Sequence, residues 1–465
     1  MSRLPSASCV VLGAAGLCLL APFMLPAPEG LDAAGWRVVG VGLGMALLWL
    51  TGALPLVATA MIPLAAFPLS GVQGMASVSA AYAHPLIILF LGGFLLARAI
   101  ETHGLHRWIA LGLMRAIGCR PSGVIAGVML ATAFLSLWIS NTAAAMIMAP
   151  IGAAIAASRA EDEGLAAALM LGIAFSATIG GMGSLIGTPP NALFAAYMAD
   201  AHGRPIGFAE WAAMGLPTAA ILLPLTWVML ARLAFRVDPR PLGISSAGVV
   251  RLDRAGRRVL WIAALAALGW MTRPLLARLL PGAEITDGGI AMLAALALFA
   301  GPDGRGGRLL DWDSAKALRW DVLILFGGGL ALAQALDATG VAGWMAGGMT
   351  ALAGLPLVVT VAALACVIVL VGELASNTAM AAIFLPVAGA TAIGLGADPA
   401  LVAAPVALAA SVGFMLPIAT PPNAIVFAHP AVTRGRMLRA GAPLDLIGAA
   451  VAVGVGWLIA PLVLG

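Results

Sequence analysis

The chain has 465 residues, of which 62% are hydrophobic and 9% are charged, and its mean hydropathy is +1.05. Soluble domains carry about a quarter charged residues, so this composition excludes an ordinary soluble protein and predicts an all-α protein embedded in a lipid bilayer. The net charge of +4 comes from Lys and Arg that fall mostly between apolar runs, which indicates membrane topology and not nucleic-acid binding.

Apolar runs long enough to cross a bilayer, about 20 residues each, recur along the whole chain. We predict about eleven transmembrane helices, near residues 9–25, 36–53, 55–69, 85–100, 165–197, 213–233, 259–277, 288–300, 321–338, 400–428 and 444–463. The first follows a single Arg3, and because further spans come after it we expect an uncleaved helix and not a signal peptide. Two more apolar stretches, 121–157 and 356–395, carry a polar tripeptide at their middle, which favours re-entrant hairpins.

Positively charged residues orient the predicted spans. Arginines crowd the segments 232–258, 305–319 and 434–439, whereas 70–83 and 339–356 contain no Lys or Arg. Because cytoplasmic loops carry the excess of Lys and Arg, we place these three segments inside the cell. The protein is then a multi-pass protein of the inner (plasma) membrane, with its N-terminus in the cytoplasm and its C-terminus outside. Cys9, Cys18, Cys119 and Cys366 lack paired spacing, so we predict neither a disulfide nor a metal site from them.

An internal repeat is the strongest signal in the sequence. Residues 87–105 align without gaps to residues 323–341, with nine identities in nineteen. Ser140-Asn141-Thr142 recurs as Ser376-Asn377-Thr378 at the same offset, and Thr188-Pro189-Pro190-Asn191 recurs as Thr420-Pro421-Pro422-Asn423 at nearly that offset. Three motifs in one order indicate two copies of one unit. Five predicted spans separate the copies, so the second is inverted, which is typical of a transporter with a site at the midplane.

The repeated motifs have the chemistry of an ion and anion site. Ser, Asn and Thr favour helix caps and turns, and they both donate and accept hydrogen bonds. Paired prolines break a helix, which frees carbonyl groups for Na⁺ and leaves a helix N-terminus for an anion. Near the motifs in sequence Glu373 is the one ionisable residue, so we expect a bound dianion to arrive with sodium ions. Glu373 itself is either a pairing or proton-sensing group or a solvated hairpin residue.

With these motifs, the chain from about His84 to Leu446 resembles the divalent anion:sodium symporters, the dicarboxylate and citrate transporters. The resemblance implies a homodimer in the lipid bilayer, in which a transport domain moves like an elevator against a scaffold domain. We divide the chain into scaffold helices at 1–83, a first repeat core at 84–233, a cytoplasmic loop with linking helices at 234–320, and a second repeat core at 321–465. The cores contain the hairpins 121–157 and 356–395, the broken helices 165–197 and 400–428, and the last helix 444–463.

The same resemblance assigns the site residue by residue. It implies substrate contacts from both tripeptides and both breaks: Ser140, Asn141, Thr142, Thr188, Pro189, Ser376, Asn377, Thr378, Thr420 and Pro421. It implies a first sodium site at Ser136, Ser140, Asn141 and the Gly187 carbonyl, and a second at Gly372, Ala375, Asn377 and the Ala419 carbonyl. Many relatives carry a hydroxyl where this chain has Gly372, which predicts a weaker second site.

We therefore expect no enzyme but a secondary active transporter that moves a C4-dicarboxylate such as succinate, malate or fumarate, coupled to Na⁺. The alternatives on the same scaffold are a sodium-independent dicarboxylate exchanger and a carrier of citrate or sulfate. A membrane-embedded enzyme is disfavoured because the sequence has no HExxH, GxSxG or DxxxD-type motif. A cation/proton antiporter is disfavoured because the carboxylates lie near the ends of the predicted helices.

Overall fold

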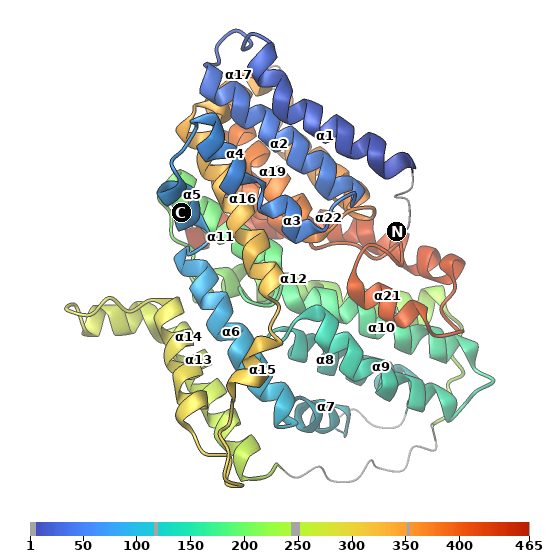
Figure 1. Ribbon diagram of the computed structural model, residues 1–465. Coiled ribbons are helices and arrows are strands. Elements are labelled where there is room, and N and C mark those ends of the chain that lie inside the picture. The colour runs from blue at the N-terminus through green and yellow to red at the C-terminus, as the bar shows by residue number, and fades with distance from the viewer. Residues whose placement is uncertain (1–5, 116–119, 243–251, 351–353, 465) are drawn as a thin grey trace.

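A computed structural model describes residues 6–115, 120–242, 252–350 and 354–464, and within these ranges the chain is helical and forms no strand (Figure 1). The fold class predicted from composition is therefore confirmed. Eight of the described helices are long and apolar enough to cross a membrane, and several shorter apolar helices accompany them. The count of eleven spans stays a prediction.

The first half of the chain contains the N-terminal helices and the first repeat. The N-terminal helices are α1 (Ser6–Met24), α2 (Ala33–Thr51), α3 (Leu56–Ala60), α4 (Ile62–Ser70), α5 (Met75–Ala81), α6 (Pro85–Thr102) and α7 (Leu105–Arg115). They are followed by α8 (Pro121–Ser136), α9 (Asn141–Ala157), α10 (Glu163–Met182), α11 (Pro189–His202), α12 (Phe208–Val228) and the π-helix η1 (Met229–Ala234).

The second half contains the linking helices and the second repeat. Its helices are α13 (Arg254–Leu279), α14 (Asp287–Ala300), α15 (Trp312–Lys316), α16 (Trp320–Ala338), α17 (Val341–Met349), α18 (Leu357–Gly372), α19 (Asn377–Gly394), α20 (Pro399–Ala409), α21 (Pro421–Phe427) and α22 (Arg434–Leu464). The predicted last span was too short. α22 begins at Arg434, so the arginines expected in a loop occupy its first turns, where they stay near the membrane surface.

Helix ends coincide with residues that stop or start a helix. Asp32, Asp162 and Asp253 each accept a hydrogen bond from the backbone N–H three residues on, at 2.6, 2.8 and 2.7 Å, and so cap α2, α10 and α13. Gly52 ends α2 and Gly203 ends α11 in the left-handed conformation that glycine adopts without strain. These local signals fix where the chain turns between spans.

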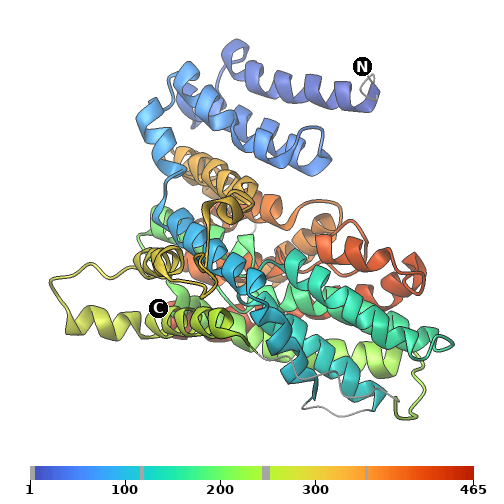
Figure 2. The same cartoon turned by 60° about the horizontal axis from the view of Figure 1, so that its bottom comes forward.

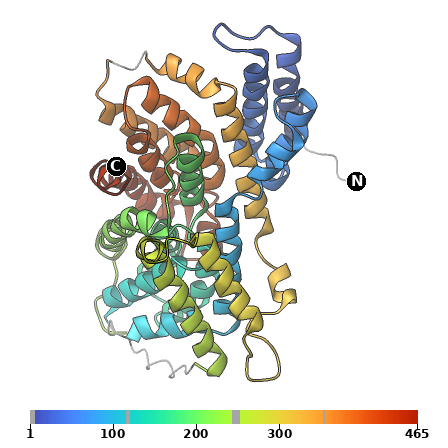
Figure 3. The same cartoon turned by 90° about the vertical axis from the view of Figure 1, so that its left-hand side faces the viewer.

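The helix contacts fall into two groups, named here the two bodies, which meet along α16. In the first body α16 packs against α2, α3, α4 and α5; in the second, α8 and α9 pack on α10, and α22 packs on α12, α18 and α20. α16 also packs against α11 and α19 of the second body. Figure 2 shows α1 and α2 at one edge of the molecule, and Figure 3 shows the N-terminal helices beside α16 on one side and the repeat helices on the other. Within the second body the repeats interleave, because α21 packs against α9 and α10 while α11 packs against α19 and α20.

The helix ends lie on two faces of the molecule, and the loops on each face contact one another. On one face His103 contacts the Leu309 carbonyl at 2.7 Å, Arg305 pairs with Asp253 at 3.1 Å, and the start of α22 reaches Glu163. On the other face, Arg204 pairs with Asp398 at 2.7 Å and Trp344 donates to the Glu29 carbonyl at 3.2 Å. The segments rich in arginine thus share a face, as expected if that face is cytoplasmic.

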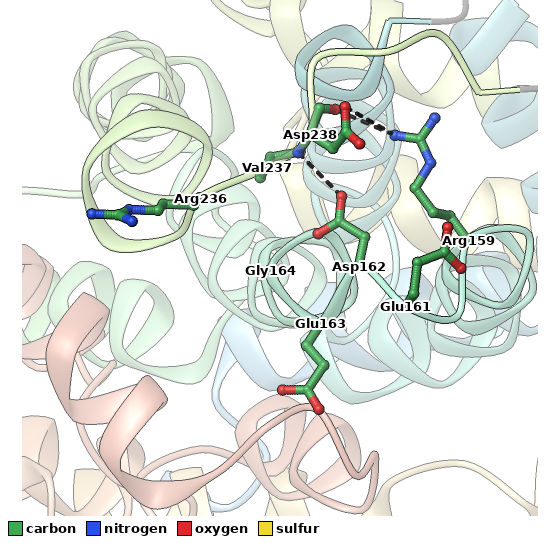
Figure 4. Close-up of a pocket in the computed structure, with 8 residues that line it drawn as sticks. All are labelled: Arg159, Glu161, Asp162, Glu163, Gly164, Arg236, Val237 and Asp238. Atoms are coloured by element: carbon green, nitrogen blue, oxygen red, sulfur yellow. Dashed lines mark hydrogen bonds and ion pairs between the residues drawn. The ribbon is translucent and has the colours of Figure 1, made fainter.

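A cavity of about 430 Å³ lined mostly by charged residues lies on the arginine-rich face, between the end of the first hairpin and residues 235–242 (Figure 4). These residues follow η1 and are called the strap. Arg159 donates to the carbonyls of Arg240 and Pro241 at 2.9 and 3.1 Å, and Asp162 accepts from the Asp238 N–H at 3.1 Å. A Cβ at Gly164 would lie 2.3 Å from the Arg236 carbonyl oxygen, so the strap crosses there only over a glycine. The strap is therefore fixed to the start of α10.

Asp162→Ala should lower the free energy of unfolding by about 1–3 kcal/mol, because it removes a helix cap and leaves the Asp238 N–H without its partner. Thermal unfolding of the purified protein measures this. Asp162→Asn retains a capping oxygen and should lose less, and equal losses in both variants would contradict the assignment.

Candidate functional site

Both Ser-Asn-Thr tripeptides lie at hairpin tips, as the sequence predicts. Ser140 precedes α9 and caps it by accepting from the Ala143 N–H at 3.2 Å; Ser376 occupies the same position before α19. Asn141 and Asn377 are the first residues of their helices, so their amides stand at helix N-termini. The hydroxyl of Ser140 is engaged in the cap.

Both Thr-Pro-Pro-Asn motifs lie where a helix is broken. Thr188 precedes α11 and Thr420 precedes α21, each in an extended conformation, and the prolines begin the new helix. The breaks separate α11 from α10 and α21 from α20.

An asparagine closes each break in the same way. The Asn191 Nδ2 donates to the carbonyls of Gly181 at 3.0 Å and Ser184 at 2.7 Å. The Asn423 Nδ2 donates to the corresponding carbonyls of the second repeat, of Gly413 at 3.1 Å and Leu416 at 3.0 Å. Both asparagines are fully buried. The repeat seen in sequence therefore extends to individual hydrogen bonds.

All four motifs line one cavity of about 710 Å³. The predicted residues that line it are Ser140, Asn141, Thr142, Gly187, Thr188, Pro189, Ala375, Ser376, Asn377, Thr378, Ala419, Thr420 and Pro421. Ser136 and Gly372 are buried behind the tips. Motifs that are far apart in sequence thus meet in a space large enough for a small anion.

Helix N-termini give this cavity its electrostatic character. α9, α11, α19 and α21 all begin at residues that line it. Each N-terminus carries a partial positive charge, and α9 and α19 also begin with backbone N–H groups that have no intrahelical partner, whereas α11 and α21 begin with two prolines, which have no N–H. Together the four helix ends favour an anion without a basic side chain at the tips. The hydroxyl groups of Thr142 and Thr378 add neutral donors.

A cluster of oxygen atoms lies behind the first tip. One terminal atom of the Asn141 amide lies 2.8 Å from Ser136 Oγ, 3.2 Å from the Ala177 carbonyl oxygen and 3.3 Å from the Gly187 carbonyl oxygen. With the amide nitrogen at that position, hydrogen bonds satisfy the cluster; with the amide oxygen there, four oxygens converge and a cation is needed to hold them together. The residues therefore fit Na⁺, and Ala177 joins the predicted set.

The polar atoms of the second tip make fewer hydrogen bonds than those of the first. The Asn377 Nδ2 donates to the Ser411 carbonyl at 3.4 Å, while Asn377 Oδ1 has no hydrogen-bond partner. The Ala375 N–H donates to the Gly372 carbonyl at 3.2 Å, and Gly372 offers no side chain. An unpaired amide oxygen on the residue that corresponds to Asn141 in the repeat fits a second cation site.

Glu373 is buried, so the reading of it as a solvated hairpin residue was wrong. Its carboxylate accepts from the Met415 N–H at 3.0 Å and the Leu416 N–H at 2.6 Å, and Asp445 accepts from the Phe414 N–H at 2.9 Å. Both side chains are 2% exposed. Glu373 and Asp445 thus hold the segment between α20 and α21 against the second tip.

The structure adds lining residues that the sequence motifs did not identify. Trp49, Thr51 and Phe90 line the cavity from the helices of the other body, and so do Arg319 and Asp321. Arg319 forms two hydrogen bonds of 2.9 Å to Asp321, and both side chains are about 50% exposed. Phe90 lies in the repeated segment 87–105, but the other four residues lie outside the repeated motifs, so no signal in the sequence connects them to the tips.

Known proteins match this chain over almost its whole length. Residues 7–464 match the model of a family described as "Sodium:sulfate symporter transmembrane region". The sodium-dependent dicarboxylate transporter SdcS of Staphylococcus saprophyticus is 36% identical over 97% of this chain and 91% of the relative. The protein of the same name from Staphylococcus aureus strain bovine RF122 is 37% identical over 94% of this chain and 88% of the relative.

A solved structure shares the fold. The YdaH transporter of Alcanivorax borkumensis, described as having an unusual topology, superposes with a TM-score of 0.61 at 15% identity, covering 97% of this chain and 98% of that one. The arrangement of helices is thus shared with that structure over 97% of this chain.

Proposed function

The chain belongs to the sodium:sulfate symporter family, and on this premise we propose that it is a secondary active transporter that moves a C4-dicarboxylate across the membrane together with Na⁺. The resemblance drawn from the tripeptides and the helix breaks is thereby confirmed. Succinate, malate and fumarate all carry two carboxylates at a short separation, and the cavity of about 710 Å³ accommodates any of them.

One observation carries the proposal: both tips and both breaks line the same cavity. A carboxylate bound there accepts hydrogen bonds from Asn141, Thr142, Asn377 and Thr378 and faces four helix N-termini. The charge of the dianion is balanced by sodium ions, the first held behind Asn141 by oxygens of Ser136, Gly187 and Ala177, and the second behind Asn377. Coupling follows because each ion species binds this site more tightly when the other is present.

We further propose an elevator movement in which the body that contains α8–α12 and α18–α22 slides along the body of α16 and the N-terminal helices. The cavity lies between residues of both bodies, and its half-exposed residues Arg319 and Asp321 belong to the arginine-rich face. With that face in the cytoplasm, the cavity is open inward. The homodimer, the plasma-membrane location and the cytoplasmic N-terminus belong to the same proposal.

Uptake of labelled succinate into proteoliposomes tests it. An inward Na⁺ gradient should raise the initial rate about tenfold or more over an equal K⁺ gradient, because the cations offset the charge of the dianion in the cavity. Sodium-independent uptake that depends on internal dicarboxylate would instead assign an exchanger. Competition by citrate or sulfate, but not by succinate, would assign one of those anions.

A further inference from the structure

We infer that Ser411 supplies to the second cation site the side-chain oxygen that Gly372 does not, so that the two repeats place their hydroxyl ligand on different elements. The inference rests on the proposed sodium coupling and identifies a residue outside the ligand set implied by family resemblance.

The starting point is the asymmetry between the two tips. In the first repeat Ser136, on the hairpin, places its Oγ 2.8 Å from the Asn141 amide. The residue at the corresponding position of the second hairpin is Gly372, so this hairpin contributes no hydroxyl there. A cation behind Asn377 then has one oxygen fewer than a cation behind Asn141, unless another element supplies it.

Ser411 lies at the place where that oxygen is missing. Its carbonyl accepts from Asn377 Nδ2 at 3.4 Å, so residue 411 is next to the second tip. Its side chain is fully buried, and its Oγ has no hydrogen-bond partner. Most buried hydroxyls in these helices donate to a carbonyl four residues earlier, as those of Thr132, Thr218 and Thr391 do. A buried hydroxyl without a partner has a cost that a bound cation removes.

Two other buried hydroxyls, of Thr226 and Thr360, also lack a partner, but neither residue hydrogen-bonds to a hairpin tip. Asn377 Oδ1 is unpartnered as well, so each of these two hydrogen-bonded residues has an oxygen without a partner. The side chains of Glu373 and Asp445 accept hydrogen bonds from the N–H groups of the adjacent residues 414–416, so carboxyl oxygens also lie next to residues that closely follow Ser411 in the chain.

The repeat itself supplies an independent argument. The equivalent buried asparagines, Asn191 and Asn423, set the register between the two broken helices, and in this register Ser411 corresponds to Ile179. The first repeat therefore has a hydroxyl on the hairpin, at Ser136, and an aliphatic side chain at Ile179 of α10. The second repeat has no side chain on the hairpin, at Gly372, and a hydroxyl at Ser411, two residues after the end of α20.

Sodium-dependent thermal stabilisation of the purified, substrate-free protein tests the assignment, with choline replacing Na⁺ at constant ionic strength. Ser411→Ala should raise the half-saturating Na⁺ concentration about tenfold, because a side-chain oxygen bound to a charge is lost. Gly372→Ser in the Ser411→Ala background should restore it, since a Cβ at Gly372 would meet only Met380 Cγ, at 3.8 Å.

Ser176→Ala is the matched control, because Ser176 is a fully buried serine of α10 whose Oγ donates to the Gly172 carbonyl. It should leave the Na⁺ response unchanged. If Ser411→Ala does not fold, Ser411→Cys retains most of the volume and removes the hard oxygen. An unchanged Na⁺ response in the Ser411 variants, with a normal response in the wild type, overturns this inference alone. Absence of any Na⁺-specific response in the wild type contradicts the proposed sodium coupling itself.

Discussion

Replacing Asn141 or Asn377 by alanine should reduce sodium-driven dicarboxylate uptake about 100-fold or more. Each asparagine lines the cavity at the N-terminus of its helix, and each is proposed to bind a cation as well. Alanine removes both contacts at once, and hydrogen bonds to charged groups are among the strongest that a side chain makes. Initial rates of labelled succinate uptake in proteoliposomes measure the loss.

Thermal unfolding and size-exclusion profiles establish that the two variants are folded. Thr272→Ala is a suitable control, since Thr272 lies on α13, is exposed, and donates only to the Leu268 carbonyl of its own helix. Uptake near the wild-type rate by both asparagine variants would refute the site.

The second large effect is expected from a single methyl group at Gly181. A Cβ there would lie 2.2 Å from Asn141 Oδ1, far closer than real Cβ atoms approach, so Gly181→Ala forces the Asn141 side chain out of its cluster. We expect at least a tenfold loss of uptake and a higher half-saturating Na⁺ concentration. Both follow from the displaced Asn141 amide.

The second repeat provides the matched comparison. Gly413 corresponds to Gly181, because Asn423 and Asn191 donate to their carbonyls, but a Cβ at Gly413 would meet Ala419 Cβ at 3.4 Å. That contact is ordinary, so Gly413→Ala should remain within about twofold of the wild-type uptake. Equal losses in the two variants would show that the close approach to Asn141 is not what matters.

The sequence predicted the hairpin tips and helix breaks because their residues have local causes. Ser140 and Ser376 occupy the N-cap positions of their helices, Ser140 with a capping hydrogen bond, and Pro189 and Pro421 begin helices, whatever the rest of the chain does. The repetition of these motifs at nearly constant spacing then indicated that they form one unit. That expectation agrees with the single cavity which they line.

Residues whose role depends on tertiary contacts were not predictable in the same way. Arg319 and Trp49 reach the cavity from the other body, and Glu373 is buried because Met415 and Leu416 come to it from a segment far along the chain. Hydropathy also placed the start of the last helix too late, because arginines in the first turns of α22 resemble a loop in an apolar profile. The position of neighbouring elements, and not local preference, decides such cases.

The interleaving of the repeats has a consequence for biosynthesis. α21 packs against α9 and α10, and α11 packs against α19 and α20. Each half of the chain therefore buries helices of the other half. A ribosome-bound first half would leave the polar groups of its hairpin without their partners, and stable packing must wait until α21 has been inserted. Cutting the gene between α12 and α13 should thus give two fragments that need each other to escape degradation.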